Sequence, residues 1–238
     1  MISLPPLRAR RQAGALAVAL AAALGGAPTL AAIPAAERQA LTDLYASAGG
    51  ANWSNKTNWN GAAGTECTWH GVTCSGAAGS ERVSVLKLNA NNLTGTLPAS
   101  LANLTALTTL NLFQNALTGP IPALSGMAGL TTVSLGQNQL SGPIPALTGL
   151  AQLQSFEVRG GQLTGPTPSL AGLASLVDFN VSGNRLDGGI GPLAGATALE
   201  NFNANNNQLT GAIPDLTGLA ALKTFWVSNN RLPAMAGL

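Results

Sequence analysis

A 23-residue period constrains the fold of this chain more than any other feature. Each period begins the pattern Leu-x-x-Leu-x-Leu-x-x-Asn-x-Leu, whose places are numbered here as positions one to eleven. A unit of this size is too small to bury its own leucines, whereas stacked units share one apolar interior, so the period predicts a solenoid. Position one holds Leu107, Leu130, Leu153, Leu176, Leu199 and Leu222, and an earlier copy begins at Val83.

Apolar residues alternate at positions four and six of each unit, as in Leu110 and Leu112. This alternation places both side chains on one side of a short strand, so one strand per unit is expected to stack in parallel. The asparagine at position nine is expected to bond backbone groups on the buried side of the turn. That location argues against the alternative that these asparagines contact a ligand. They are Asn91, Asn115, Asn138, Asn184, Asn207 and Asn230.

The second half of most units contains a glycine followed three residues later by a proline, as in Gly119-Pro-Ile-Pro122. Glycine permits unusual dihedral angles and proline fixes φ, which favours a short extended piece and a turn over a long helix. With the preceding Leu-Thr pair, this half resembles the plant-specific class of leucine-rich repeats. The predicted fold is an α/β solenoid, a right-handed leucine-rich-repeat arc with a 3-10 or extended convex side. Seven units are expected over residues 83–238, the last one incomplete.

The N-terminus has the features of an export signal. Arg8, Arg10 and Arg11 precede an apolar stretch of 12 residues from Ala13 to Leu24, which is too short to span a bilayer as a helix. We predict a signal peptide over residues 1–31, with an uncleaved anchor as the alternative. Its removal leaves 11 − 3 = 8 basic residues against 9 acidic ones. This balance argues against nucleic acid, and we expect a secreted, periplasmic or cell-surface protein without stable membrane insertion.

Residues 32–82 differ in composition from the repeats and predict an N-terminal cap. A short amphipathic helix is expected over residues 37–46, and Cys67-Thr-Trp-His-Gly-Val-Thr-Cys74 contains both cysteines of the chain, which predicts a disulfide. The motif resembles the capping domain of plant receptor-like kinases and polygalacturonase-inhibiting proteins, and Trp69 is expected to cover the open end of the solenoid. A zinc site with His70, the one histidine, is rejected because the spacing is wrong. No metal and no cofactor are expected.

Positions two, three, five, seven and eight are expected to line a concave face that binds a partner. Phe113 and Trp226 are predicted as exposed aromatic anchors. Four charged residues in three consecutive strands are expected to form one patch that sets specificity, with a solvated ion-pair cluster as the alternative. The predicted binding residues are Lys87, Asn111, Phe113, Glu157, Arg159, Asp178, Asn180, Glu200, Asn203 and Trp226.

The expected function is binding of a protein or peptide, with a glycan as a further candidate. Alternatives are an inhibitor of a wall-degrading glycosidase and a structural or adhesive surface protein. No enzyme is expected: Glu157 and Asp178 are the one carboxylate pair that suggests glycoside hydrolysis, but no nucleophile motif or phosphate loop accompanies them. The last unit lacks a recognisable cap, so self-association through its apolar edge is also expected.

Overall fold

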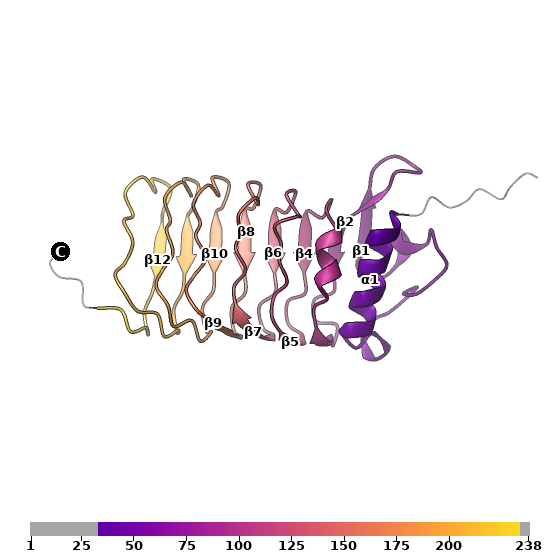
Figure 1. The fold of residues 1–238 in the computed structure, drawn as a ribbon, viewed down its shortest axis with the longest axis horizontal. Coiled ribbons are helices and arrows are strands. Elements are labelled where there is room, and N and C mark those ends of the chain that lie inside the picture. Colours follow the sequence, from indigo (N-terminus) through magenta and orange to yellow (C-terminus); the bar gives the residue numbers. More distant parts are fainter. Residues whose placement is uncertain (1–32, 234–238) are drawn as a thin grey trace, which may run out of the picture.

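A computed structural model describes residues 33–233 as a solenoid of stacked coils (Figure 1). The predicted signal at residues 1–31 and the last five residues of the chain lie outside these described residues. One side of the solenoid is an eight-stranded sheet in the order β1-β2-β4-β6-β8-β10-β11-β12. Its strands are β1 (Val72–Ser75), β2 (Arg82–Lys87), β4 (Thr109–Asn111), β6 (Thr132–Ser134), β8 (Ser155–Glu157), β10 (Asp178–Asn180), β11 (Asn201–Asn203) and β12 (Thr224–Trp226).

The strands from β2 to β12 are parallel and in register, which confirms the prediction of one short parallel strand per unit. Position four is buried in every one of these strands except β12, where Phe225 is half-buried. The cap adds β1 antiparallel to β2, a pairing that the repeat pattern does not contain. Strand β1 contains Cys74 and so belongs to the cap. By pairing with β2, the cap covers the N-terminal edge of the eight-stranded sheet.

The opposite side contains a second sheet of β3 (Thr94–Thr96), β5 (Ala116–Gly119), β7 (Gln139–Pro143) and β9 (Gln162–Thr164). The sequence predicts extended pieces here but not their pairing into a sheet. In five units the glycine of the Gly-x-x-Pro motif adopts a left-handed φ, for example 73° at Gly119 and 79° at Gly142, so these turns require glycine. Within residues 33–233, the first unit alone adds a 3-10 helix on this side, η3 (Ala99–Asn103).

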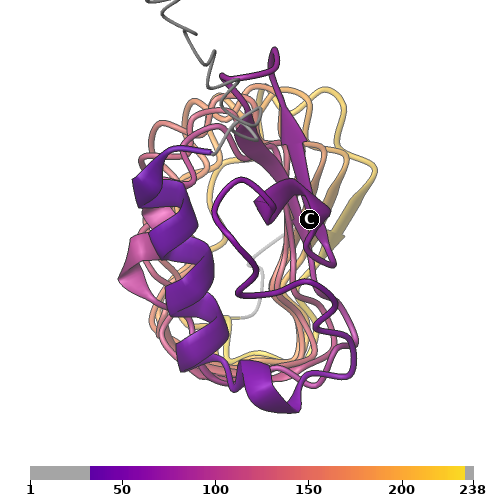
Figure 2. The same ribbon diagram turned by 90° about the vertical axis from the view of Figure 1, so that its right-hand side faces the viewer.

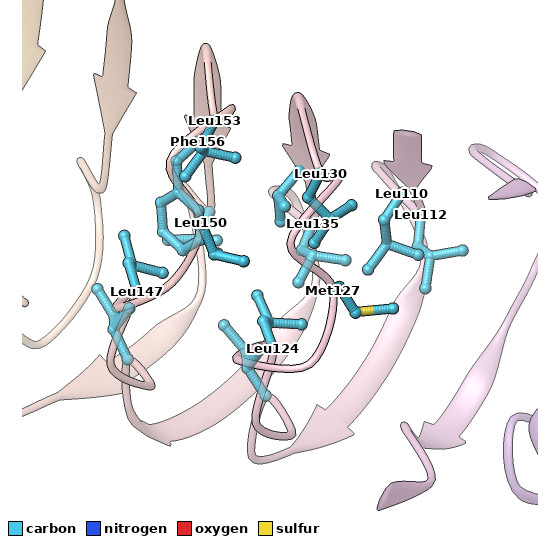
Figure 3. Close-up of a cluster of buried hydrophobic side chains, with 14 of the residues drawn as sticks. Leu110, Leu112, Leu124, Met127, Leu130, Leu135, Leu147, Leu150, Leu153 and Phe156 are labelled. Carbon is cyan, nitrogen blue, oxygen red and sulfur yellow. The ribbon is translucent and has the colours of Figure 1, made fainter. Parts of the chain in front are cut away.

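Leucines from the strands and from the opposite side point at one another and fill the interior (Figure 3). In the C-terminal half, position four is phenylalanine in four consecutive strands. The rings of Phe156, Phe179, Phe202 and Phe225 stack at centroid separations of 5.7, 5.3 and 4.8 Å. These spacings are close to the distance between neighbouring strands, so the sheet register itself produces the stack.

The asparagines at position nine bond backbone groups, as predicted, and together form a ladder along the solenoid. Asn138 Nδ2 donates to the carbonyls of Leu112 and Leu135 at 3.0 and 2.8 Å, and its Oδ1 accepts from the Leu117 amide at 3.0 Å. Each asparagine thus joins its own turn to the preceding unit, which satisfies backbone groups that no strand pairs. The ladder is interrupted at Gly161, where the sequence has no asparagine.

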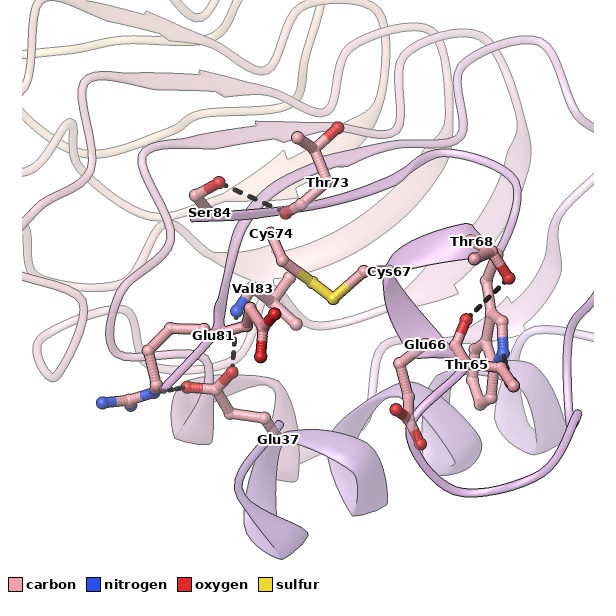
Figure 4. Close-up of a disulfide and its surroundings, with 12 residues drawn as sticks. Glu37, Thr65, Glu66, Cys67, Thr68, Thr73, Cys74, Glu81, Val83 and Ser84 are labelled. Carbon is pink, nitrogen blue, oxygen red and sulfur yellow. Dashed lines mark hydrogen bonds and ion pairs between the residues drawn. A yellow bond between two sulfur atoms is a disulfide. The ribbon is translucent and has the colours of Figure 1, made fainter. Parts of the chain in front are cut away.

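The cap begins with α1 (Ala35–Ser47) and continues through η1 (Gly50–Asn52) and η2 (Glu66–Thr68). Viewed along the solenoid, α1 lies at its N-terminal end, over the side of the coils opposite the eight-stranded sheet (Figure 2). The buried Glu37 carboxylate pairs with Arg82 and accepts from the Val83 amide at 2.8 Å, which fixes α1 to β2 (Figure 4). A second contact between cap and repeats is made by Asp43 Oδ2, which accepts from the Ser100 hydroxyl at 2.6 Å.

The disulfide between Cys67 and Cys74 is formed, with a Cα–Cα distance of 5.5 Å (Figure 4). Trp69 is 1% exposed and packs against Trp59 at a centroid distance of 5.0 Å, so an aromatic cluster fills the cap. Trp69 is therefore buried within the cap, and its predicted role as cover for the end of the solenoid stays a prediction. None of the helices in residues 33–233 combines the length and apolar character of a membrane span.

The final unit is packed less completely than the others. Its apolar residues Leu222, Phe225, Val227 and Leu232 are half-buried against the core. The self-association expected at this edge stays a prediction.

Candidate functional site

The outer surface of the eight-stranded sheet, called the strand face below, corresponds to the predicted concave face. Its side chains form rows along the solenoid because the strands are in register. The position-three row contains Asp178 beside Asn201, and the position-five row ends in Trp226. The full position-five row is Lys87, Asn111, Ser134, Glu157, Asn180, Asn203 and Trp226.

An open groove of about 290 Å³ lies between these two rows across β8, β10, β11 and β12. Trp226 is 51% exposed and forms one wall of the groove. Glu157 and Asp178 are the charged residues of the lining, and the buried rings of Phe156 and Phe179 lie beneath them. The remaining lining residues are Ser155, Asn180, Asn201 and Asn203.

Arg159 is turned away from this groove. Its Nε lies 2.9 Å from Glu157 Oε1, and its guanidinium lies 5.3 Å from the centroid of the Phe113 ring. Gly136 occupies the same position on the intervening strand, and a Cβ there would come within 2.4 Å of Glu157 Oε1. The missing side chain therefore makes room for the pair. Phe113, predicted as an exposed anchor, is half-buried beneath Arg159, so that prediction is wrong.

The four charged residues predicted as one patch separate into different arrangements. Glu157 and Arg159 pair with each other, whereas Asp178 Oδ1 accepts from Asn201 Nδ2 at 2.6 Å. Glu200 pairs with Lys223 at 2.7 Å and does not line the groove. Glu200 thus lies outside the groove that Glu157 and Asp178 line, and a single patch of all four residues stays a prediction. The sequence analysis missed Lys223. Its signal is that Lys223 and Glu200 both occupy position two, in consecutive units.

The other predicted binding residues divide between the two ends of the strand face. Asn180 and Asn203 lie in the groove, and the Oδ1 atom of each accepts the backbone amide two residues later. Lys87 and Asn111 are paired neighbours on β2 and β4, at the end near the cap and away from the groove. Within residues 33–233 no group of three or more His, Cys, Asp or Glu side chains is placed to hold a metal ion.

Comparison with protein-family models gives two matches. A leucine rich repeat N-terminal domain matches residues 34–75, and a leucine rich repeat matches residues 82–104. The chain therefore contains an N-terminal leucine-rich-repeat cap followed by leucine-rich repeats. Its matched cap contains α1 and the disulfide, and its matched repeat contains β2 and β3.

Two curated relatives of this leucine-rich-repeat protein come from rice. Over 110 residues it is 38% identical to the receptor protein kinase WSS1 of Oryza sativa subsp. japonica, covering 46% of the chain and 10% of the relative. Over 111 residues it is 39% identical to polygalacturonase inhibitor 1 of the same organism, covering 45% of the chain and 32% of the relative.

Among solved structures, the plant peptide hormone receptor RGFR1 in complex with RGF2 matches with a TM-score of 0.57 and 30% identity. The match covers 62% of this chain and 24% of the receptor. The leucine-rich-repeat protein therefore spans about a tenth to a third of the length of these three proteins.

Proposed function

We propose that this leucine-rich-repeat protein binds a protein or peptide partner on its strand face, at the cell surface or after secretion. The observation that carries the proposal is the groove beside Trp226, the one large apolar side chain of residues 33–233 that is mainly exposed. Exposed tryptophans in grooves are frequent anchors of protein interfaces. The similarity to a peptide hormone receptor in complex with RGF2 supports a peptide as the class of partner.

The geometry favours binding over catalysis. The groove is open, and its carboxylates are engaged by neighbouring side chains: Glu157 by Arg159 and the Ser134 hydroxyl, and Asp178 by Asn201. No nucleophile with an adjacent base lines the groove among the residues described. The strand face therefore offers fixed polar contacts and an aromatic surface.

The proposal is tested with a partner captured by the purified protein from extracts and then measured in isolation against single variants. Trp226→Ala should weaken binding by about 2 kcal/mol, mainly through faster dissociation. Charge reversal of Asp178 to lysine should change the association rate and its dependence on salt. Gln139→Ala is the matched control, because Gln139 is exposed in β7 of the opposite sheet. Unchanged affinity in both strand-face variants would refute the proposal.

A second candidate is inhibition of a wall-degrading glycosidase, which the 39% identity to polygalacturonase inhibitor 1 favours. Here the partner would be the enzyme itself. Polygalacturonase assays with added purified protein test this candidate, and inhibition that Trp226→Ala abolishes would place the contact on the strand face. Full enzyme activity at a large excess of the protein would eliminate it.

A further inference from the structure

We propose that the groove beside Trp226 receives an arginine side chain of the partner. This inference rests on the proposed binding function and names the group that the groove recognises. The guanidinium would lie against Asp178 and the indole of Trp226. Three observations support it: the charge of the groove, the supply of free acceptors, and the position of the indole.

The charge of the groove is negative. Glu157 and Asp178 line it, and no lysine, arginine or histidine does so. The closest candidate for a neutralising cation is Arg159, but its guanidinium lies over Phe113, on the other side of Glu157. Asp178 makes no ion pair within residues 33–233, where the charged pairs are those of Arg38, Arg82, Arg159 and Lys223. A cation entering the groove would therefore meet an uncompensated carboxylate.

The polar atoms of the groove that remain free to hydrogen-bond favour a ligand that donates hydrogen bonds. Asp178 Oδ1 accepts from Asn201, whereas Oδ2 accepts from no donor in the described residues. The oxygens of Asn180 and Asn203 are occupied by their own turns. The strongest open acceptor is thus one carboxylate oxygen, and a guanidinium has donors only.

The shape of the groove fits a long side chain with a planar charged end. It spans β8 to β12, which are three strand spacings or about 14 Å apart. Trp226 lies at one end, and Asp178 is two strands away in the other row. The methylene stem of arginine can lie along the groove while the guanidinium contacts the indole face, an arrangement that favours arginine over lysine. A neutral sugar would also stack on Trp226 but would gain nothing from the charge.

The test uses two capped pentapeptides, acetyl-Gly-Gly-Arg-Gly-Gly-amide and the same peptide with citrulline, the neutral analogue of arginine. Binding is followed by NMR at the Trp226 indole N–H, which is assigned by its loss in Trp226→Phe. We expect the arginine peptide to bind at least tenfold more tightly than the citrulline peptide. Asp178→Asn should weaken the arginine peptide at least tenfold. Asp187→Asn is the matched control, because Asp187 lies outside the groove and its asparagine analogue can still accept from the Gly165 amide.

Equal binding of the arginine and citrulline peptides would overturn the inference, as would equal losses in Asp178→Asn and Asp187→Asn. It would also be overturned if cellotetraose shifted the Trp226 signal while the arginine peptide did not. Failure here is distinct from failure of the proposed function. If the captured partner loses affinity in Trp226→Ala but not in Asp178→Asn, the strand face binds the partner and the arginine inference is wrong. If the partner tolerates both changes, both proposals are wrong.

Discussion

Position eight of each unit lies in the left-handed region of φ, and its residue type varies along the chain. A non-glycine residue in this conformation costs roughly 1–2 kcal/mol, which asparagine partly avoids by local hydrogen bonding. Alanine has no such compensation, so Ala90 is the least favourable residue of the series. The series is Ala90, Gln114, Gln137, Gly160, Gly183, Asn206 and Asn229, with φ of 50°, 58°, 54°, 67°, 64°, 56° and 56°.

Two substitutions should therefore change stability in opposite directions. Ala90→Gly removes the cost of roughly 1–2 kcal/mol but adds about 0.5–1 kcal/mol of backbone entropy to the unfolded chain, for a net gain of about 0.5–1 kcal/mol. Gly183→Ala reverses both effects. A Cβ at Gly183 would lie 3.6 Å from Gly160 Cα, an ordinary contact, so the loss of about 0.5–1 kcal/mol comes from the backbone alone.

Urea unfolding measures both variants, with hydrogen exchange at the Ala90 amide, which donates to the Phe113 carbonyl at 2.9 Å, as a local probe. Ala174→Gly is the control, since Ala174 is exposed and does not have a positive φ. It should lower stability, as glycine ordinarily does. The reasoning would be refuted if Ala90→Gly destabilised the protein as much as this control, or if Gly183→Ala were neutral.

Three further predictions concern the cap and the core. Replacement of both Cys67 and Cys74 by serine should raise hydrogen exchange in the cap and first unit while units four to six stay protected; a uniform rise along the solenoid would contradict this. Phe179→Ala should cost about 3–5 kcal/mol in urea unfolding, because its ring is 1% exposed in the phenylalanine stack, and half-buried Phe113→Ala should cost clearly less. The hydrogen bond from Ser100, with a second from Gln39, lowers the pKa of Asp43 below its usual 3.8. This carboxylate therefore stabilises the cap above pH 3.8, and the stabilisation is lost as the pH falls through the pKa of the folded state. Asp43→Asn should slightly reduce the acid sensitivity of hydrogen exchange in the cap. An unchanged dependence of this exchange on pH would count against the contact.

The repeat period accounts for most of what could be predicted of the fold. Because the units repeat at a nearly constant spacing of 23 residues, one correctly interpreted unit predicts the strand and the buried positions of the others, and the asparagine turn of all but the unit with Gly161. The pairing of the extended pieces into a second sheet could not be predicted from the period. The Gly-x-x-Pro half predicts a bend, but whether neighbouring bends hydrogen-bond as β3, β5, β7 and β9 do depends on how closely the coils stack. The same holds for β1, whose partner β2 belongs to the first repeat.

The repeat period also places the residues that line the groove on one face of the sheet, although the groove itself was not predicted. In-register stacking places Glu157, Asp178 and Trp226 on one surface as soon as the period is known, so their common face follows from the sequence. The burial of Phe113 does not follow from the period, because it depends on a contact with Arg159 two strands away. Its signal in the sequence is the glycine at position 136, between Phe113 and Arg159 in the position-seven row.

A missing side chain in a row of a solenoid lets the side chains on either side meet. Here Gly136 allows Arg159 to reach Phe113, and this contact holds the guanidinium outside the groove that Asp178 and Trp226 line. A side chain at position 136 would compete with the Glu157 carboxylate for the same space. The negative charge of the groove thus depends on a glycine outside it, which connects the composition of one row to the specificity we propose for its neighbour.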